Sequence, residues 1–454
     1  MKDYDIIVLG SGSGLELVQQ GSARGLSVAL VEPAAFGGTC LNVGCIPSKM
    51  LIATADIIVE QYRASRLGVE LHVRNIDFPG IMQRMRDSRA SSNEQLEASI
   101  GDLPGVDLYR AAGTFTGPHE VDVDGQQISG RQVFVGVGGR PFIPPIKGLS
   151  DVDYLTNETL LEMTELPESM VILGGGYIAV EYGHFFSAMG VQVTILEMAD
   201  RLVMAEEEEI SAVLEEELSA RVRIATGMKA EEVQKTSAGV KVVARGTQTG
   251  ESATYEAEAL LVAVGRIPNS DTVAAERAGF LLDRHGNMKV DEYMRTSQPG
   301  VWAIGDINGK SMFRHSANVM ALVAAADALE ERQIPMKYDA IPYAVYSYPQ
   351  IASVGLTEAQ AREAGLEFIV ARAPYTSTAK GEALAEDAGF AKAIVERDSE
   401  RILGFHIIGL HAPILIQEVV NAMQSGGHVD ELIRGVHIHP SLSELIPSVL
   451  AELG

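Results

Sequence analysis

The stretch that decides the fold lies near the N-terminus, where residues 5–15 read Asp-Ile-Ile-Val-Leu-Gly-Ser-Gly-Ser-Gly-Leu. The run Asp5–Leu9, apolar after its first residue, predicts a buried strand. A glycine turn follows, then a helical pattern to about Gly25 and a second strand over Ser27–Val31. A strand, a glycine turn, a helix and a second strand together indicate a nucleotide-binding βαβ unit.

The glycine turn contains the residues that such a unit needs to hold a dinucleotide. Gly10 permits the tight turn, and Gly12 lets the backbone approach a pyrophosphate at the N-terminus of the helix. Glu32 lies 20 residues after Gly12, where a carboxylate can bind the hydroxyl pair of a ribose. Leu15 stands where the third glycine belongs, so we expect looser packing between helix and strand.

The same pattern returns near the middle of the chain. Met170–Leu173 predicts a strand, the glycines 174–176 a turn, and the residues to about Met189 a helix. A further strand over Val191–Leu196 ends at Glu197. The chain therefore has two dinucleotide sites, or one such site and a second unit that no longer binds a nucleotide.

Glu197 indicates the choice of coenzyme. It lies 21 residues beyond Gly176, where a carboxylate accepts from the free 2′-hydroxyl of NAD and repels the 2′-phosphate of NADP. Arg201 argues for NADP instead, because it could pair with the 2′-phosphate. We expect it to pair with the acids around it. The sequence therefore predicts NAD(H).

Composition narrows the class of protein. The chain has 454 residues, 36 Lys plus Arg against 61 Asp plus Glu, and a net charge of -25, so no basic footprint for nucleic acid is visible. The acidic N-terminus lacks the basic start of a secretory signal, and no apolar run reaches the roughly 18 to 20 residues of a membrane span. We expect a cytoplasmic protein that binds neither nucleic acid nor a membrane.

The only two cysteines, Cys40 and Cys45, predict redox chemistry. A zinc site would need about two more ligands, and no nearby His supplies them, so we expect no metal. Five residues of regular helix rise about 7.5 Å, beyond easy disulfide reach, but Gly44 allows the local unwinding that could close the pair. A helix that opens next to Lys49 would lower the pKa of the thiols. The alternative is two buried, inert thiols.

Residues 37–49, Gly-Gly-Thr-Cys-Leu-Asn-Val-Gly-Cys-Ile-Pro-Ser-Lys, resemble the redox-active disulfide signature of the FAD-dependent pyridine nucleotide-disulfide oxidoreductases of class I. Three further stretches extend the resemblance over essentially the whole chain: Ala263–Asn269, Thr296–Asp306 and Ser353–Glu358. The pattern is closest to the lipoamide (dihydrolipoyl) dehydrogenase branch. It also has features of mycothione reductase, at Leu15, Val135–Gly138 and His315–Met320.

The resemblance implies an α/β fold with two Rossmann-like FAD/NAD(P)-binding domains and an α+β C-terminal dimerisation domain. With linkers rich in Pro and Gly as boundaries, we expect the first part of the FAD-binding domain at 1–145, the NAD-binding domain at 146–270, a return segment of the FAD-binding domain at 271–337 and the dimerisation domain at 338–454. Glu206–Glu209 and Glu215–Glu217 predict the solvated face of an amphipathic helix, without a function.

The resemblance also implies roles for the redox pair and its neighbours. Cys40 would be the interchange thiol that attacks substrate, and Cys45 the charge-transfer thiolate under the flavin. Lys49 and Glu181 would pair near flavin N5, with an ordinary salt bridge as the alternative. Tyr177 would cover the nicotinamide pocket, with a core aromatic as the alternative.

A second catalytic group is implied near the C-terminus. In the family, the His before Pro is the acid–base catalyst supplied by the other subunit, which is His439 here, and Glu444 would orient it. Expulsion of a thiolate needs a proton donor with a pKa near 7, and an imidazole is one. A metal pair or surface pair with His437, or a capping box of Ser441 and Glu444, are the structural alternatives, and we expect His437 to be scaffold.

The residues expected to bind cofactors lie in the two turns, at the strand ends and in the family motifs. For FAD they are Gly10, Gly12, Gly14, Glu32, Gly38, Thr39, Lys49, Gly138, Asp306 and Ala317. For NAD they are Gly174, Gly176, Tyr177, Glu197 and Gly265.

The implied function is that of a homodimeric, dihydrolipoamide dehydrogenase-like flavoenzyme. It would transfer electrons between a dihydrolipoyl dithiol/disulfide and NAD(H) through Cys40, Cys45 and FAD, with a lipoyl-bearing carrier protein or a small disulfide as partner. Two alternatives stay open: an NAD(P)H-dependent reductase of a low-molecular-weight disulfide, such as mycothione or glutathione reductase, and a flavin-bearing redox sensor without turnover. Mercuric reductase is disfavoured because its extra C-terminal cysteine pair is absent.

Overall fold

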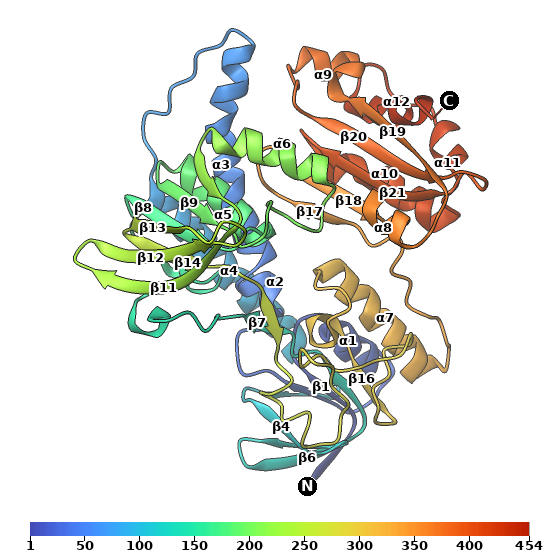
Figure 1. Cartoon of the computed structure of the whole chain (residues 1–454). Coiled ribbons are helices and arrows are strands. Elements are labelled where there is room, and N and C mark those ends of the chain that lie inside the picture. Colours follow the sequence, from blue (N-terminus) through green and yellow to red (C-terminus); the bar gives the residue numbers. More distant parts are fainter. Residues whose placement is uncertain (454) are drawn as a thin grey trace. The chain divides into compact units, whose positions relative to one another are not determined.

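The computed structural model describes residues 1–453, which form two compact units (Figure 1). Unit 1 comprises Met1–Ser48, Gln83–Phe142 and Gly265–Met336. Unit 2 comprises Lys49–Met82, Ile143–Val264 and Lys337–Gly454. The finer domain boundaries expected from the sequence stay a prediction.

Unit 1 is built on a seven-stranded sheet in the order β3-β2-β1-β6-β5-β4, with β16 beside β6. The pairs among β1, β2, β3, β6 and β16 are parallel, and β4 and β5 form an antiparallel edge. The strands are β1 (Lys2–Leu9), β2 (Val28–Val31), β3 (Val106–Tyr109), β4 (Gly113–Gly117), β5 (Glu120–Val123), β6 (Gln126–Val135) and β16 (Val301–Ala303), and a separate ribbon pairs β7 (Gly139–Pro141) with β15 (Arg266–Pro268).

Unit 1 also contains helices, two of which continue into unit 2. They are α1 (Leu15–Ala23), α2 (Gly38–Asn42), α7 (Arg314–Glu330) and the short 3-10 helix η3 (Gly305–Asn308), while α3 (Cys45–Arg66) and α4 (Phe78–Gly101) each have residues in both units. β1, α1 and β2 confirm the first predicted βαβ unit. Ile6–Leu9 is almost fully buried, as expected for a parallel strand covered on both faces.

Unit 2 contains the second βαβ unit, again as predicted. Its four-stranded parallel sheet has the order β10-β9-β8-β14, and a three-stranded antiparallel sheet has the order β11-β12-β13. The elements are β8 (Ser169–Leu173), α5 (Tyr177–Ala188), β9 (Gln192–Leu196), α6 (Glu208–Ser219), β10 (Val222–Ala225), β11 (Met228–Thr236), β12 (Gly239–Gly246), β13 (Ser252–Ala257) and β14 (Ala259–Val262), preceded by η1 (Leu149–Asp151) and η2 (Thr159–Glu162).

The C-terminal part of unit 2 is an α+β region around a five-stranded antiparallel sheet in the order β17-β18-β21-β20-β19. Its strands are β17 (Tyr343–Val345), β18 (Ile351–Gly355), β19 (Phe368–Pro374), β20 (Phe390–Glu396) and β21 (Ile402–Ile408). The helices are α8 (Glu358–Glu363), η4 (Tyr375–Ser377), α9 (Ala379–Ala383), α10 (Ala412–Ser425), α11 (Asp430–Ile433), η5 (Leu442–Glu444) and α12 (Leu445–Ala451). The α/β class with two nucleotide-binding units and an α+β C-terminal region is therefore confirmed.

One expectation about the acidic helix is wrong. Glu206 and Glu207 precede α6 instead of lying on its solvated face, and only 2% and 5% of their surfaces are exposed. They are buried because Ser353 and Lys392 of the C-terminal sheet bind their carboxylates. Glu208 alone among the first three acids is exposed.

The helical stretch Gly38–Arg66 is long and apolar enough to cross a membrane by length and composition, a test that core helices of soluble proteins also pass. Its later part binds charged side chains within unit 2. Lys49 pairs with Glu181, and Asp56 lies 2.9 Å from His184 Nε2. These contacts favour a helix that packs against protein.

Candidate active site

The first glycine turn fixes a carboxylate beside itself in unit 1. Gly10 has φ +96°, and a Cβ there would lie 2.3 Å from the carbonyl oxygen of Gly136, so only glycine fits. Glu32 Oε2 accepts from the backbone N of Ser11 at 2.9 Å and from Ser11 Oγ at 2.8 Å. Its Oε1 accepts from the backbone N of Ala34 at 3.0 Å. Glu32 is thus held at the end of β2 with its orientation fixed.

The space in front of this turn suits a dinucleotide. A Cβ on Gly12 would have only Gly38 Cα as a neighbour, at 4.0 Å, so packing does not require this glycine and its missing side chain leaves the turn open. No side chain caps the N-terminus of α1, which leaves its amides for a phosphate. The expected loose packing at Leu15 is wrong, because Leu15 is buried and the close approach is made at Gly14, where a Cβ would lie 2.5 Å from Gly10 O.

The other residues expected to bind FAD also lie in unit 1, except Lys49. Gly38 and Thr39 begin α2, and Gly138 accepts from the backbone N of Asn269 at 3.0 Å. Asp306 lies in η3, and burial raises the pKa of its carboxyl, with Arg266 Nε 3.6 Å away. Ala317 is buried on α7, 7% exposed.

The second glycine turn repeats the first in unit 2. Gly174 has φ +106°, and a Cβ there would lie 2.4 Å from the carbonyl oxygen of Ala263. Glu197 Oε2 accepts from the backbone N of Gly175, and Oε1 from the backbone N of Ala199 at 2.7 Å. Nothing lies within 4 Å of the position of a Cβ on Gly176, and no side chain caps α5. This turn therefore fits a second dinucleotide.

The side chains around Glu197 affect whether the second turn can accept the 2′-phosphate of NADP. Arg201 Nη2 donates to the backbone oxygens of Met204 at 3.2 Å and Glu206 at 3.4 Å. The expected pairing with neighbouring carboxylates is therefore replaced by contacts with carbonyls. Tyr177 is the first residue of α5 and is 38% exposed. Gly265 has φ +137° and belongs to unit 1, where its carbonyl accepts from the backbone N of Phe142 at 2.9 Å.

The two cysteines lie on either side of a break in the helix. α2 ends at Asn42 and α3 begins at Cys45, so the local unwinding predicted at Gly44 is confirmed. The structure holds the pair as two thiols, with Cys40 half-buried and Cys45 exposed. A hydrogen bond with the Cys45 side chain, followed by burial, raises the pKa of the Cys40 thiol. The expected lowering is therefore wrong for Cys40 in this dithiol form.

Arg314 adds a cation beside the cysteine loop that the sequence analysis missed. Its Nη1 donates to the backbone oxygen of Gly37 at 3.2 Å and its Nε to Asn318 Oδ1 at 3.0 Å. Its charge lowers the pKa of Cys40, against the larger effects of Cys45 and burial. Arg314 and Gly37 are 277 residues apart, so no local motif could have indicated the contact.

Lys49 and Glu181 form the expected pair, inside unit 2. Lys49 Nζ lies 2.9 Å from Glu181 Oε1 and 2.7 Å from Oε2, and the Glu181 side chain is 4% exposed. Tyr346, which the sequence analysis also missed, completes the arrangement. Its backbone N donates to Glu181 Oε1 at 3.0 Å, and its ring centroid lies 4.7 Å from Lys49 Nζ. The ammonium is thus fixed by a buried carboxylate and an aromatic face.

His439 and Glu444 are also brought together. His439 Nδ1 lies 2.9 Å from Glu444 Oε1, and the His439 side chain is 71% exposed. Glu444 Oε2 accepts from the backbone N of Ser441 at 2.9 Å, so the capping box exists as well and holds the carboxylate that contacts the imidazole. The Ser441 amide, followed by His439, lowers the pKa of Glu444. His437 Nε2 lies 2.8 Å from Glu418 Oε1, and its charge also contributes to lowering the pKa of Glu444.

Comparisons with known proteins agree with this geometry. Residues 4–327 match the family described as pyridine nucleotide-disulphide oxidoreductase, and residues 341–449 match its dimerisation domain. The chain is 37% identical to mycothione reductase of Mycobacterium tuberculosis (strain H37Rv), with 100% of both chains covered. It is 33% identical to dihydrolipoyl dehydrogenase of Synechocystis sp., over 98% of this chain and 97% of that protein.

Among solved structures, the flavoprotein disulfide reductase RclA of Escherichia coli aligns with a TM-score of 0.88 and 28% identity, over 99% of each chain. The cofactors of these proteins are FAD and NAD(P)H, which the two glycine turns fit. The chain belongs to the FAD-dependent pyridine nucleotide-disulphide oxidoreductases.

Proposed function

We propose that this flavoenzyme is an NAD(H)-dependent dihydrolipoyl dehydrogenase, acting on a lipoyl group of a carrier protein. The observation that carries the proposal is the Glu197 carboxylate, oriented by two backbone amides at the second glycine turn. A carboxylate there favours the free 2′-hydroxyl of NAD and repels a 2′-phosphate. In this proposal NAD⁺ is the electron acceptor when the dithiol is oxidised.

The cysteine pair exchanges the two electrons of the substrate. In the oxidised enzyme a dihydrolipoyl thiolate attacks the Cys40 sulfur of the Cys40–Cys45 disulfide, forms a mixed disulfide and releases Cys45 as a thiolate. The second substrate thiolate then attacks the substrate sulfur of the mixed disulfide, closes the lipoyl ring and expels the Cys40 thiolate. FAD, when bound, supplies the route by which this electron pair reaches NAD⁺.

His439 takes the proton of the attacking thiol. Its Nδ1–H is engaged by Glu444, which leaves the Nε2 lone pair as the base. Glu444 is itself held by the Ser441 amide, so the imidazole has a fixed tautomer and orientation. We propose that His439 serves the cysteines of the other subunit of a homodimer, which the dimerisation domain supports.

The Lys49–Glu181 pair and Tyr177 are proposed to serve the coenzyme side. Lys49 lies one turn after Cys45 on α3, and its ammonium is fixed by Glu181. A fixed cation near the thiol favours the thiolate. Tyr177 is exposed at the start of α5, and we propose that it covers the nicotinamide pocket. We propose that the enzyme works in the cytoplasm, because two cysteines are too few for a secreted fold held by several disulfides.

A second candidate is reduction of a low-molecular-weight disulfide. The observation that favours it is the higher identity to mycothione reductase, 37% against 33% for dihydrolipoyl dehydrogenase. Steady-state assays separate the two. Oxidation of dihydrolipoamide by NAD⁺ and reduction of lipoamide by NADH should exceed turnover of glutathione, mycothiol and bis-glutamylcystine disulfides in kcat/KM. Faster turnover of one of those disulfides, or a preference for NADPH, would replace the first proposal by the second.

A further inference from the structure

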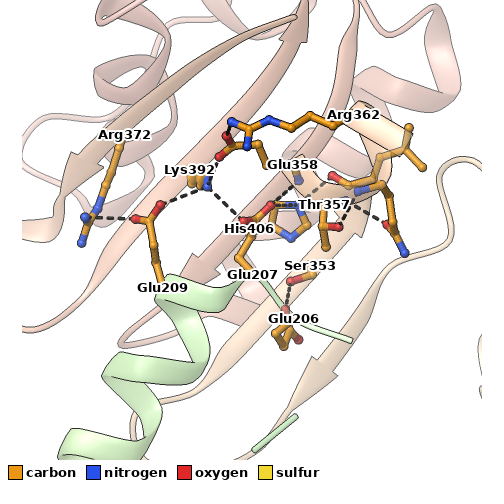
Figure 2. Close-up of polar contacts among 12 residues, drawn as sticks. Glu206, Glu207, Glu209, Ser353, Thr357, Glu358, Arg362, Arg372, Lys392 and His406 are labelled. Carbon is orange, nitrogen blue, oxygen red and sulfur yellow. Dashed lines mark hydrogen bonds and ion pairs between the residues drawn. The ribbon is translucent and has the colours of Figure 1, made fainter. Parts of the chain in front are cut away.

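A short loop connects the coenzyme turn of unit 2 to the C-terminal sheet of the same unit. Figure 2 shows the sheet end of this loop, where Glu206 contacts Ser353. At one end, the backbone N of Val203 donates to the backbone oxygen of Gly175, inside the glycine turn, at 2.8 Å. At the other end, the backbone N of Glu206 donates to Val203 O at 2.8 Å, and Arg201 Nη2 donates to Glu206 O at 3.4 Å. A displacement of Glu206 therefore reaches Gly175 through two hydrogen bonds.

The C-terminal sheet anchors the Glu206 end of this loop. Ser353 Oγ, on β18, donates to Glu206 Oε2 at 2.6 Å, and Tyr343 Oη, on β17, donates to the backbone oxygen of Ala205 at 3.2 Å. Within the described residues the other carboxylate oxygen of Glu206, Oε1, is buried without a hydrogen bond, although the Tyr343 hydroxyl also faces this carboxylate. An unpartnered buried carboxylate oxygen is costly when ionised and less so when protonated.

The charges around Glu206 do not neutralise it. Glu207, its neighbour on the loop, faces it with a like charge, and Glu207 is itself bound by Lys392 of β20 at 2.9 Å. Lys392 Nζ also contacts Glu209 at 3.1 Å and Glu358 at 2.8 Å, so its charge is shared among three carboxylates. His406 of β21 donates from Nε2 to the backbone carbonyl of Leu356 at 3.0 Å and lies 3.9 Å from Glu207 Oε1, and burial lowers its pKa.

We propose that Glu206 is a positioning residue of the coenzyme site, whose protonated form holds the Val203–Glu206 loop against the glycine turn and whose ionised form releases it. The inference rests on the proposed binding of NAD(H) at this turn. It makes coenzyme affinity depend on pH through a group that touches neither coenzyme nor substrate.

The burial of Glu206 determines the pH range over which coenzyme affinity changes and the direction of that change. Burial, with Glu207 adding to it, raises the pKa of Glu206 to about 7 from its ordinary value of 4.5, against the opposing effects of Ser353 and Tyr343. With the loop released, Glu206 is solvated and its pKa returns toward the ordinary value. Release is therefore least favourable below that value, becomes up to about tenfold more favourable per pH unit, and levels off above pH 7. Coenzyme binding should weaken over this window as pH rises.

Calorimetric titration of NAD⁺ into the oxidised holoenzyme tests the proposal, because no hydride is exchanged there. We expect the Kd of the wild type to rise at least about threefold between pH 5.5 and 7.5, a part of the full linkage. In Glu206→Gln, which keeps the shape and cannot ionise, this rise should disappear. Glu208→Gln, the same change at the exposed position two residues later, is the matched control and should retain the rise.

A second variant keeps the test decisive if Glu206→Gln fails to fold. Ser353→Ala removes the hydrogen bond that stabilises the carboxylate, so the rise in Kd should continue to higher pH before it levels off. Identical profiles for the wild type, Glu206→Gln and Ser353→Ala would overturn the proposal. Absence of NAD⁺ binding in every protein at every pH would instead overturn the coenzyme site of the proposed function.

Discussion

The equivalent carboxylates of the two glycine turns differ in their hydrogen bonds and in their burial. In the first, Glu32 accepts from two backbone amides and from the Ser11 hydroxyl, and it is 9% exposed. In the second, Glu197 accepts from two backbone amides only, because Gly175 stands where the first turn has Ser11, and it is half-buried. A rigid, buried turn suits a cofactor that stays bound, and a looser one suits a coenzyme that must leave after each turnover.

The contacts that support the two turns also differ. The first turn is held within unit 1, where the backbone N of Gly37 donates to Ser11 Oγ at 3.1 Å and Ser13 Oγ donates to Asn318 Oδ1 at 2.8 Å. The second turn is contacted by the 203–206 loop, which Ser353 of the C-terminal sheet anchors. The second turn is therefore linked to the C-terminal sheet of its own unit.

The largest expected effect comes from filling the turns. Gly10→Ala places a methyl group 2.3 Å from Gly136 O at φ +96°, and Gly174→Ala places one 2.4 Å from Ala263 O at φ +106°. Each should cost about 2–4 kcal/mol in the free energy of unfolding. Gly10→Ala should be purified without flavin absorbance, whereas Gly174→Ala should retain the flavin and lose NAD⁺ binding. Loss of flavin from both variants alike would remove the distinction between the turns.

A smaller effect is expected from neutralising the carboxylates. Glu197→Gln removes like-charge repulsion worth about 1–3 kcal/mol, so the ratio of kcat/KM for NADPH to that for NADH should rise roughly tenfold or more. Glu32→Gln is the matched control, because the same change at the first turn should leave that ratio unchanged and weaken flavin retention instead. An equal shift of the ratio in both variants would contradict the assignment of Glu197 to coenzyme choice.

The smallest effect concerns the hydroxyl that distinguishes the turns. Ser11→Ala leaves Glu32 with its two backbone amides, the arrangement that Glu197 has. The change removes the hydrogen bond to Glu32 and the one that the backbone N of Gly37 donates to Ser11 Oγ, and it should weaken FAD binding by about 1 kcal/mol, or roughly fivefold in Kd. Dialysis of the holoenzyme followed by measurement of the released flavin would detect this. Unchanged FAD retention in Ser11→Ala would mean that the hydroxyl does not stiffen the first turn.

The strand-turn-helix units, the carboxylates at their ends and the cysteine break could be predicted because their signals are local. The apolar run Ile6–Leu9 sets the strand, and Gly44 marks the interruption between the two cysteines. Glu206 and Glu207 were mispredicted because they continue the pattern of an amphipathic helix. Their burial depends on Ser353, 147 residues later, and on Lys392, 185 residues later.

Arg314 and Tyr346 were missed for a related reason. An arginine or a tyrosine carries no motif, and each becomes part of the site only through contacts across the fold: Arg314 with Gly37, and Tyr346 with Glu181 and Lys49. The direction of the Cys40 pKa was mispredicted because the nearby cation was counted and the hydrogen bond between the two thiols was not. Long-range pairing and burial set these properties, and neither is encoded in local spacing.

The central claim is that Cys40 and Cys45 form the redox centre, with Cys45 as the thiolate that faces the flavin. The most direct measurement is the long-wavelength absorbance of Cys40→Ser and Cys45→Ser without any reductant. Cys40→Ser leaves Cys45 as a free thiol at the start of α3, four residues before Lys49 in the sequence. We expect the helix N-terminus and a nearby lysine to favour its thiolate.

We therefore predict a charge-transfer shoulder in Cys40→Ser, none in Cys45→Ser, and loss of lipoamide turnover in both variants. A shoulder in Cys45→Ser instead would reverse the roles of the two sulfurs. Absence of the shoulder from both variants, with lipoamide turnover intact, would contradict the claim that the pair is the redox centre.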